Sequence, residues 1–151
     1  MLGAPTARHF VIAAGLCLAT LSSAMAQNMV SVKGNTLNMR SGPGTQTEVL
    51  WQLKQGYPLE VVRRQNNWLQ VKDFEGDTGW VASSLTSSTP HHIVKSPTAN
   101  VRSGPGTQHR IVGKANYGDV VRTREKRGTW VRVERAGEPN GWIAKSLLWG
   151  W

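Results

Sequence analysis

Cysteine is almost missing from this sequence of 151 residues, in which Cys17 is the only one. Small exported domains often depend on disulfide bonds because they cannot bury a large core. One cysteine in an N-terminal apolar run excludes an internal disulfide. It also excludes thiol catalysis and a cysteine-based metal site in the remainder of the chain. Packing alone must therefore stabilise the folded part.

Hydrophobic runs long enough to cross a membrane are also missing. The apolar run “FVIAAGLCLATL” has 12 residues, whereas a spanning helix needs about 20. The run follows Arg8 and precedes “SSAMA”, in which Ala24 and Ala26 occupy the small-residue positions of a cleavage site. We therefore expect residues 1–26 to be a signal peptide cleaved after Ala26. The mature chain is then expected to lack an integral membrane segment and to be periplasmic or secreted.

The sequence patterns of common catalytic sites are missing as well. There is no H-E-x-x-H and no G-x-S-x-G. His91 and His92 are adjacent in an expected linker, where solvation is favoured over a weak metal contact, and His109 follows a turn. We expect a protein that is not an enzyme and that has no cofactor and no metal site.

What the sequence does contain is a repeat. Residues 38–46 read “NMRSGPGTQ” and residues 100–108 read “NVRSGPGTQ”, and the ungapped match at this offset of 62 positions extends to the later “GWVA” and “GWIA”. A unit of this length suits a small self-contained domain. We expect two tandem domains, residues 28–87 and 93–151, joined by a short exposed linker at 86–92.

Each copy has the pattern of short strands and turns. No window longer than ten residues has a helical apolar stripe, so we expect an all-β fold. Proline and glycine in “SGPG” predict a turn, which is favoured over a phosphate-binding loop because no helix follows. The acids Asp73, Glu75 and Asp77 are too few for a calcium loop and are not repeated, so they predict a polar hairpin. The expected strands are “TLNMR”, “LEVVR”, “NWLQVK” and “TGWVA”, then “TANVR”, “DVVRT”, “TWVRVE” and “NGWIA”.

The order of these segments resembles the bacterial SH3 domain family, SH3b. The resemblance rests on N-x-R-S-G-P-G followed by G-W-[VI]-A, occurs in both copies and covers nearly all of the chain after the signal peptide. It implies two small SH3-like β-barrels. Family members commonly bind cell-wall peptide or polysaccharide, often beside wall-cleaving enzymes, or act as protein-interaction modules. The resemblance implies no fixed set of ligand residues.

Tryptophans divide into repeated and unrepeated ones. Trp80 and Trp142 lie between a glycine and a β-branched residue, which favours core packing in so small a barrel. Trp68 and Trp130 are repeated and are candidates for a ligand groove. Among the unrepeated ones, Trp51 aligns with a glycine. Trp149 and Trp151 in the terminal “LLWGW” could pack between the domains or bind a partner.

Positive charge is concentrated in the second copy. Residues 29–85 have 6 basic and 5 acidic side chains, and residues 90–151 have 11 basic and 4 acidic. The excess lies in “RTREKRGTWVRVER”, which we call the basic strip. The strip could be an ordinary solvated face, but its charge favours an anionic partner. Nucleic acid does not suit an exported protein, whereas wall carboxylates do.

Together these observations predict a non-catalytic binding protein that recognises peptidoglycan or its stem peptides. The alternative is a scaffold that binds an exported, acidic protein partner through the basic strip and the C-terminal “LLWGW”, with Trp149 and Trp151. A wall-cleaving enzyme is the third and weakest hypothesis. The predicted ligand-binding residues are Arg40, Trp68, Arg102, Arg122, Arg124, Trp130 and Arg132.

Overall fold

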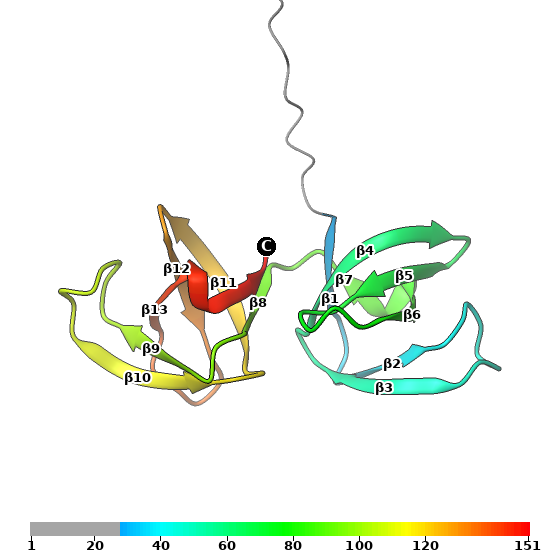
Figure 1. The fold of residues 1–151 in the computed structure, drawn as a ribbon, viewed down its shortest axis with the longest axis horizontal. Helices are drawn as coiled ribbons and strands as arrows, with labels where there is room; N and C mark the ends of the chain where they lie inside the picture. The colour runs from blue at the N-terminus through cyan, green and yellow to red at the C-terminus, as the bar shows by residue number, and fades with distance from the viewer. Residues whose placement is uncertain (1–27) are drawn as a thin grey trace, which may run out of the picture.

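The repeat in the sequence appears in the fold as two seven-stranded sheets with the same strand order. The computed structural model describes residues 28–151, so the expected signal peptide lies outside the described residues. The first sheet has the order β3-β2-β6-β5-β4-β1-β7, and the second repeats it as β10-β9-β13-β12-β11-β8-β14. Figure 1 shows the two curled sheets side by side. The prediction of two tandem all-β domains is confirmed.

The first barrel is built from strands and one short 3-10 helix. Their bounds are β1 Met29–Val32, β2 Thr36–Arg40, β3 Val49–Lys54, β4 Pro58–Gln65, β5 Trp68–Lys72, β6 Thr78–Ala82, η1 Ser83–Leu85 and β7 Thr86–Ser87.

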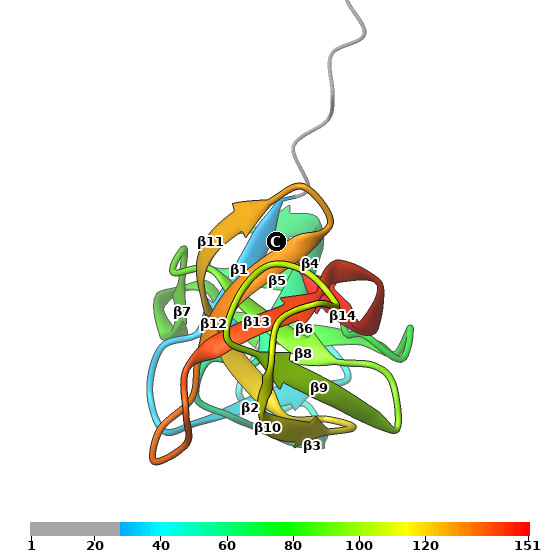
Figure 2. The same cartoon turned by 90° about the vertical axis from the view of Figure 1, so that its left-hand side faces the viewer.

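The second barrel repeats these elements in the same sequence. Their bounds are β8 His91–Val94, β9 Thr98–Arg102, β10 Ile111–Asn116, β11 Val120–Arg127, β12 Trp130–Glu134, β13 Gly141–Ala144, η2 Lys145–Leu147 and β14 Leu148–Gly150. In Figure 2 the second barrel faces the viewer, with the first barrel behind it.

Alternation along the strands explains which side chains form the two cores. In β2, Leu37 and Met39 are buried while their neighbours are at least partly exposed, and in β9 Ala99 and Val101 repeat the pattern. Successive side chains of a strand point to opposite faces of its sheet, so each strand contributes every second residue to the barrel interior. The first core is Val30, Val32, Leu37, Met39, Leu53, Leu59, Leu69, Val71 and Val81. The second is Val94, Ala99, Val101, Ala115, Val121, Val131, Val133, Ile143 and Leu148.

Bulges recur at matching positions in both barrels. The β2–β3 register shifts at Leu50 and the β9–β10 register shifts 62 positions later, at Val112. Similarly, the β4–β5 shift falls at Val62 and the β11–β12 shift at Arg124. A bulge adds one unpaired residue and sharpens the twist that closes a small sheet into a barrel. The duplicated unit therefore includes the irregularities of the sheet as well as its strands.

A glycine begins the “GWVA” and “GWIA” strands because another strand passes too close for a side chain. A Cβ atom on Gly141 would lie 2.5 Å from the backbone oxygen of Arg102 and 2.8 Å from Val101. We expect Gly141→Ala to destabilise the second barrel by about 2 kcal/mol, since overpacking of this kind costs about 1–3 kcal/mol. Thermal unfolding followed by tryptophan fluorescence measures the loss.

The matched control for Gly141 is Gly34→Ala. Nothing lies within 4 Å of a Cβ at Gly34, and the second copy has Ser96 at this position. We expect its unfolding temperature to equal that of the unsubstituted protein. Equal stability of Gly141→Ala and Gly34→Ala would contradict the close approach described above.

The structure confirms that Trp80 and Trp142 are buried but places them outside the two core clusters. Their exposed fractions are 6% and 7%. Each follows a buried glycine and precedes a core residue, so strand alternation turns the indole to the outer face of the sheet. The guanidinium groups of Arg63 and Arg127 cover the two rings, with the Cζ atoms 5.1 Å and 5.2 Å from the ring centroids. Cation–π packing by arginine therefore buries these rings.

The prediction that His91 and His92 are solvated linker residues is wrong. Both belong to β8, and His92 is 1% exposed. Its ring Nδ1 lies 2.5 Å from the Thr123 hydroxyl on the adjacent strand β11. Burial lowers the pKa of His92 to about 4, and the positive charges of Lys126 and Lys145 add to this effect, against the opposing effect of a hydrogen bond that the ring donates to the Trp151 backbone.

The C-terminal strand closes the second sheet. Residues Leu148–Gly150 form β14, which pairs with β8 through Leu148↔Val94 and Trp149↔Ile93. The same strand comes close to β4 of the first barrel, so the C-terminus lies at the boundary between the barrels (Figure 1). Within residues 28–151, no helix has the length and apolar character needed to cross a membrane.

Candidate functional site

A small groove on the second barrel joins two of the predicted ligand residues, Arg102 and Trp130. Its volume is about 190 Å³. The residues that line it are Thr98, Asn100, Arg102, Thr107, Trp130, Ala144 and Leu147.

Strand geometry explains why these side chains meet. Thr98, Asn100 and Arg102 alternate along β9 with the core residues, so all three face outward. Trp130 begins β12 and pairs directly with Ala144 at the end of β13. The small alanine beside the indole leaves one face of the ring accessible, and Trp130 is half-buried. The groove therefore combines an aromatic surface, polar side chains and a guanidinium group.

The arginine of each repeated phrase holds the turn that follows it. Arg102 Nη1 donates hydrogen bonds to the carbonyl oxygens of Thr107 at 3.0 Å and His109 at 2.9 Å. Arg40 Nη1 does the same with Thr45 at 2.9 Å and Thr47 at 2.8 Å. In both arginines, Arg40 and Arg102, all of these hydrogen bonds are donated by Nη1. Each arginine thus has a structural role, and its remaining N–H groups are available to a ligand.

We expect Arg102→Gln to loosen the turn between β9 and β10. Losing two hydrogen bonds from a charged donor to backbone carbonyls costs about 2 kcal/mol locally. Hydrogen exchange of the backbone amides in residues 103–110 should accelerate by about tenfold or more, while β12 and β13 keep their protection. The exposed Arg110→Gln is the control in the same turn. Unchanged exchange in Arg102→Gln would contradict the structural role.

Trp130 also lines a second hollow next to the groove. This hollow has a volume of about 420 Å³ and is lined by Thr129, Trp130, Ala144, Lys145 and Ser146. It shares Trp130 and Ala144 with the groove. An extended ligand in the groove can therefore continue past the indole into this second hollow.

The first barrel carries the same residue at every groove position. Subtracting the offset of 62 from the seven lining residues gives Thr36, Asn38, Arg40, Thr45, Trp68, Ala82 and Leu85. Trp68 pairs with Ala82 as Trp130 pairs with Ala144. Leu85 is a large apolar side chain with 50% of its surface exposed. We call the seven residues of each barrel its groove set.

Three of the six basic side chains of the basic strip form ion pairs within it. Arg124 forms an ion pair with Glu134, and Arg132 lies 3.8 Å from Glu125. Arg127 also pairs with Glu125, at 2.6 Å. The strip keeps a net positive charge, because six basic side chains face two acidic ones. Arg124 and Arg132 line a polar hollow of about 580 Å³ with Val133, Glu134 and Asn140, separate from the groove.

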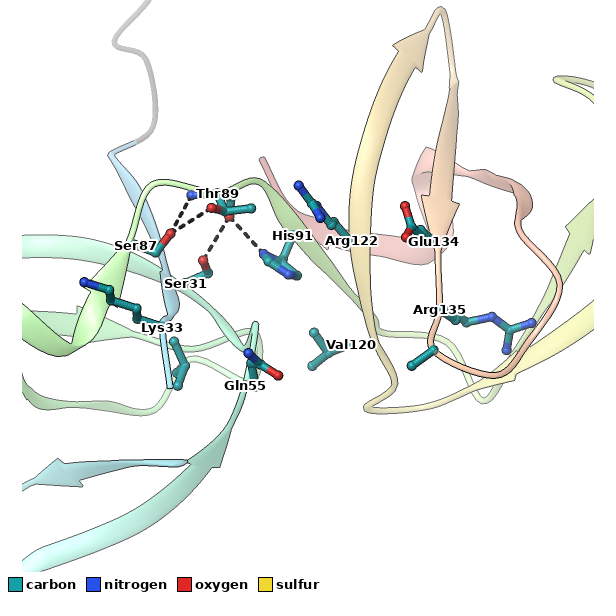
Figure 3. Close-up of a pocket in the computed structure, with 12 residues that line it drawn as sticks. Ser31, Lys33, Gln55, Ser87, Thr89, His91, Val120, Arg122, Glu134 and Arg135 are labelled. Atoms are coloured by element: carbon teal, nitrogen blue, oxygen red, sulfur yellow. Dashed lines mark hydrogen bonds between the residues drawn. The ribbon is translucent and has the colours of Figure 1, made fainter. Parts of the chain in front are cut away.

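The remaining predicted residues lie elsewhere. Arg122 lines a hollow of about 630 Å³ between the two barrels together with His91 and Glu134 (Figure 3). Trp149 and Trp151 are half-buried at the C-terminal end, where Trp149 belongs to β14. The structure thus brings together Arg102 with Trp130, but not these with Arg122, Arg124 and Arg132 or with the terminal indoles. The ligand-binding and partner-binding roles stay predictions.

Sequence reasoning missed the other members of the groove set. Thr98, Asn100 and Leu147 have no chemistry that singles them out in one copy. The available signal was the repeat itself: residues on the outward side of a strand have no packing reason to be identical in both copies. Identity between Asn38 and Asn100, both only partly buried, could have indicated the groove.

Models of the bacterial SH3 domain family match both halves of the chain. One matches residues 33–88 and another matches residues 97–148. The chain therefore belongs to the bacterial SH3 domain family and contains two tandem copies of the domain.

Among curated proteins, the chain is similar to one from Bacillus subtilis (strain 168) that is named “Putative N-acetylmuramoyl-L-alanine amidase YrvJ”. The two are 27% identical over 134 residues, which is 82% of this chain but 26% of that protein. The chain thus spans about a quarter of the length of this relative.

The chain is also similar to parts of two solved structures. NlpC2 from Trichomonas vaginalis is 15% identical with a TM-score of 0.38, over 84% of this chain and 49% of that chain. An NlpC/P60 family protein from Bacillus cereus ATCC 10987 is 14% identical with a TM-score of 0.38, over 80% of this chain and 55% of that chain.

Proposed function

We propose that this chain is a non-catalytic wall-binding protein that recognises peptidoglycan or its stem peptides through the two groove sets. The observation that carries the proposal is the identity of all seven groove residues in both barrels. Core positions around them differ between the copies, as Met39 and Val101 do, and Leu37 and Ala99. A requirement shared by the two grooves, beyond the requirement to fold, explains this contrast.

The chemistry of the groove suits a wall peptide. The free N–H groups of Arg102 can bind a carboxylate of a stem peptide in a charge-assisted hydrogen bond. Asn100 offers one donor group and one acceptor to a peptide or sugar hydroxyl. The accessible face of Trp130 can pack against a sugar ring or an aliphatic side chain. One groove then holds the charged end and the apolar body of the same short ligand.

The amidase named above supports a wall-related role, because the matched part of that protein is about the length of these two domains. The wall-cleaving activity in its name belongs to that longer protein. We propose binding without catalysis for this chain. Release of soluble muropeptides from purified sacculi by the pure protein would contradict this part of the proposal.

Sedimentation with purified wall sacculi tests binding. We expect the protein to pellet with sacculi at low ionic strength and to remain bound at about 0.15 M salt, since stacking on indole rings is little screened. Binding that disappears at this salt concentration would instead indicate non-specific attraction to the positive charge of the second barrel. Failure to pellet at any salt concentration would remove the proposal.

A second candidate function, a protein-interaction module, is supported by the outer edge of the first barrel. Strand β3 is the last strand of its sheet, and it exposes Val49, Leu50 and Trp51 by 44%, 40% and 51%. Exposed apolar side chains on a free strand edge can pair with an extended segment of another protein.

The second barrel covers its own corresponding edge. Arg135 Nη1 donates a hydrogen bond to the carbonyl of Lys114 at 2.9 Å, and its guanidinium lies over Gly113. The first barrel has Asp73 at that position, which accepts hydrogen bonds from the amides of its own hairpin instead. Capture of exported proteins from an envelope extract that is lost with Trp51→Thr would favour this second function over the first.

A further inference from the structure

The segment that joins the two barrels is hydrogen-bonded to both of them. The carbonyl oxygen of Thr89 accepts a hydrogen bond from Ser31 Oγ at 2.9 Å and lies 2.9 Å from His91 Nδ1 (Figure 3). Ser31 belongs to β1 of the first barrel and is fully buried, whereas His91 belongs to β8 of the second. One peptide group of the linker is thus held from both sides.

The rest of the linker is fixed as well. The Ser87 hydroxyl donates to Thr89 Oγ1 at 2.8 Å and accepts from the Thr89 amide at 3.0 Å. The carbonyl of Pro90 accepts a hydrogen bond from the Thr123 amide at 3.1 Å. A flexible tether would leave such groups to water. This linker has few free polar groups, so it behaves as part of the two folds.

Below the linker, the barrels touch through a glycine. Gly56 has a φ of 79° in the turn between β3 and β4. A Cβ on Gly56 would lie 2.7 Å from the ring of His91 and 3.1 Å from Val120. The matching Gly118 has nearly the same φ, 81°, but nothing lies within 4 Å of its Cβ position. Both turns need glycine because of their positive φ. In the first barrel, the absence of a side chain at Gly56 also leaves room for His91 of the second barrel.

An aromatic bridge forms the other part of the contact. The ring centroids of Tyr57 and Phe74 are 6.2 Å apart, and those of Phe74 and Tyr117 are 5.3 Å apart, with tilted planes. Tyr57 and Phe74 belong to the first barrel and Tyr117 to the second. Tilted aromatic pairs at these separations are each worth a modest stabilisation beyond the area they bury. The bridge and the fixed linker restrain both hinge and twist motions between the barrels.

The repeat separates this joint from the grooves. The positions that match Tyr57, Phe74 and Tyr117 in the other copy carry no aromatic residue; they are Asp119, Ala136 and Gln55. The groove sets are identical in the two copies. In contrast, each aromatic residue that joins the barrels is present in one copy and is replaced by a non-aromatic residue in the other. Two copies of the same groove residues have therefore been combined with a specialised connection between the barrels.

We propose that the joint makes the two barrels one rigid body and so fixes the distance and orientation between the two grooves. The ligand that such a pair selects is a polymer that repeats the same recognised unit, with two units bound at once. This proposal rests on the proposed function and adds to it that polymeric wall strands are preferred over single muropeptides. A second site held rigidly at the right spacing raises affinity by about 10²–10⁴ through effective concentration, and the gain is lost when the geometry is lost.

The test opens the joint with residues that the repeat itself supplies. Phe74→Ala introduces the residue of the second copy, and Tyr117→Gln introduces the residue of the first. Tyr117 is 51% exposed and neither side chain belongs to a core cluster, so both barrels should stay folded. A second variant with four glycine and serine residues inserted between Ser88 and Thr89 leaves every side chain in place. Val62→Thr, at an exposed bulge position, is the control.

Residual dipolar couplings measure rigidity without any ligand. We expect one alignment tensor to fit both barrels of the unsubstituted protein and of Val62→Thr, and two different tensors to be needed in the Phe74→Ala/Tyr117→Gln variant and the insertion variant. Two tensors in the unsubstituted protein, or one tensor in all variants, would overturn the rigid joint. This readout stands even if the wall is not the ligand.

Binding is measured with a purified disaccharide-peptide and with soluble glycan strands that carry several such units. We expect both joint variants to bind the single unit within twofold of the unsubstituted protein and to bind the strands at least tenfold more weakly. Unchanged strand affinity in variants that show two tensors would overturn the preference for a polymer. Failure of the unsubstituted protein to bind either probe would remove the proposed function. The alignment tensors would still show whether the joint holds the two barrels as one rigid body.

Discussion

Replacing Trp68 and Trp130 together by alanine is expected to weaken binding to wall sacculi by at least about 100-fold. Each indole is the largest surface of its groove, and tryptophans of this kind commonly contribute more than 2 kcal/mol to recognition, which corresponds to about 30-fold in affinity. The single variants should each lose one of the two sites and the gain that comes from holding both. Co-sedimentation over a range of protein concentrations measures the three affinities.

Trp51→Ala is the control for the indole substitutions. Trp51 is 51% exposed on β3 and does not belong to the groove set. It should leave wall binding within about twofold of the unsubstituted protein. Both groove tryptophans are half-buried at the first position of their strands, so their loss should lower stability only moderately. Equal wall binding by the Trp68→Ala/Trp130→Ala protein and the Trp51→Ala protein would contradict the placement of the site.

The second barrel is expected to lose stability as the pH falls from about 6.5 to about 4. The stability of the first barrel is expected to stay the same over this range. The pKa of His92 is lowered to about 4 in the folded protein, first by burial. The unfolded chain keeps a histidine pKa of about 6.5 and therefore binds more protons throughout this range. Protonation favours unfolding. The loss amounts to on the order of 3 kcal/mol once the pH is below both values.

The repeat supplies the control for the pH effect. His92 and Thr123 of the second barrel correspond to Val30 and Val61 of the first. The His92→Val/Thr123→Val protein replaces the hydrogen-bonded pair by the apolar pair of the first barrel, so no buried hydroxyl is left without its partner. Denaturant unfolding at pH 7 and pH 4.5 should show a large difference for the unsubstituted protein and a smaller one for the variant, which keeps His91, whose pKa burial also lowers. An equal pH dependence in both proteins would show that other groups cause it.

The fold could be predicted from the sequence because one unit was written twice. Alternation of polar and apolar residues predicted “TLNMR”, its repeat predicted “TANVR”, and a short apolar run predicted “TGWVA”; the three are the bounds of β2, β9 and β6. Gly-Pro-Gly predicted the turn that separates β2 from β3. Both patterns depend on contacts within a few residues, which is why local sequence was sufficient.

Strands at the edges of the barrels could not be predicted in the same way. Strand β14 contains “LWG”, which has no alternation and no β-branched residue. It becomes a strand because Leu148 pairs with Val94, more than fifty positions away. His92 was placed in a solvated linker for the same reason, since its partner Thr123 lies 31 positions along the chain. Pairing between distant segments decided both outcomes.

The candidate site was predictable in part. The repeated phrase drew attention to Arg102 and the repeated indole to Trp130, and the structure places both in one groove. The two acids of the basic strip were visible in the sequence, but the pairing of Glu134 with Arg124 depends on the register of β11 and β12. The aromatic bridge was out of reach because Tyr57, Phe74 and Tyr117 come from unrepeated positions in two different barrels.

Titration of isotope-labelled protein with a soluble disaccharide-peptide, followed by backbone amide and indole N–H chemical shifts, tests the central claim most directly. We expect chemical shifts to change at the groove set of both barrels, and we expect the changes of the Trp68 and Trp130 indole signals to be among the largest. Changes confined to the basic strip or to the β3 edge, with both groove indoles unaffected, would contradict it.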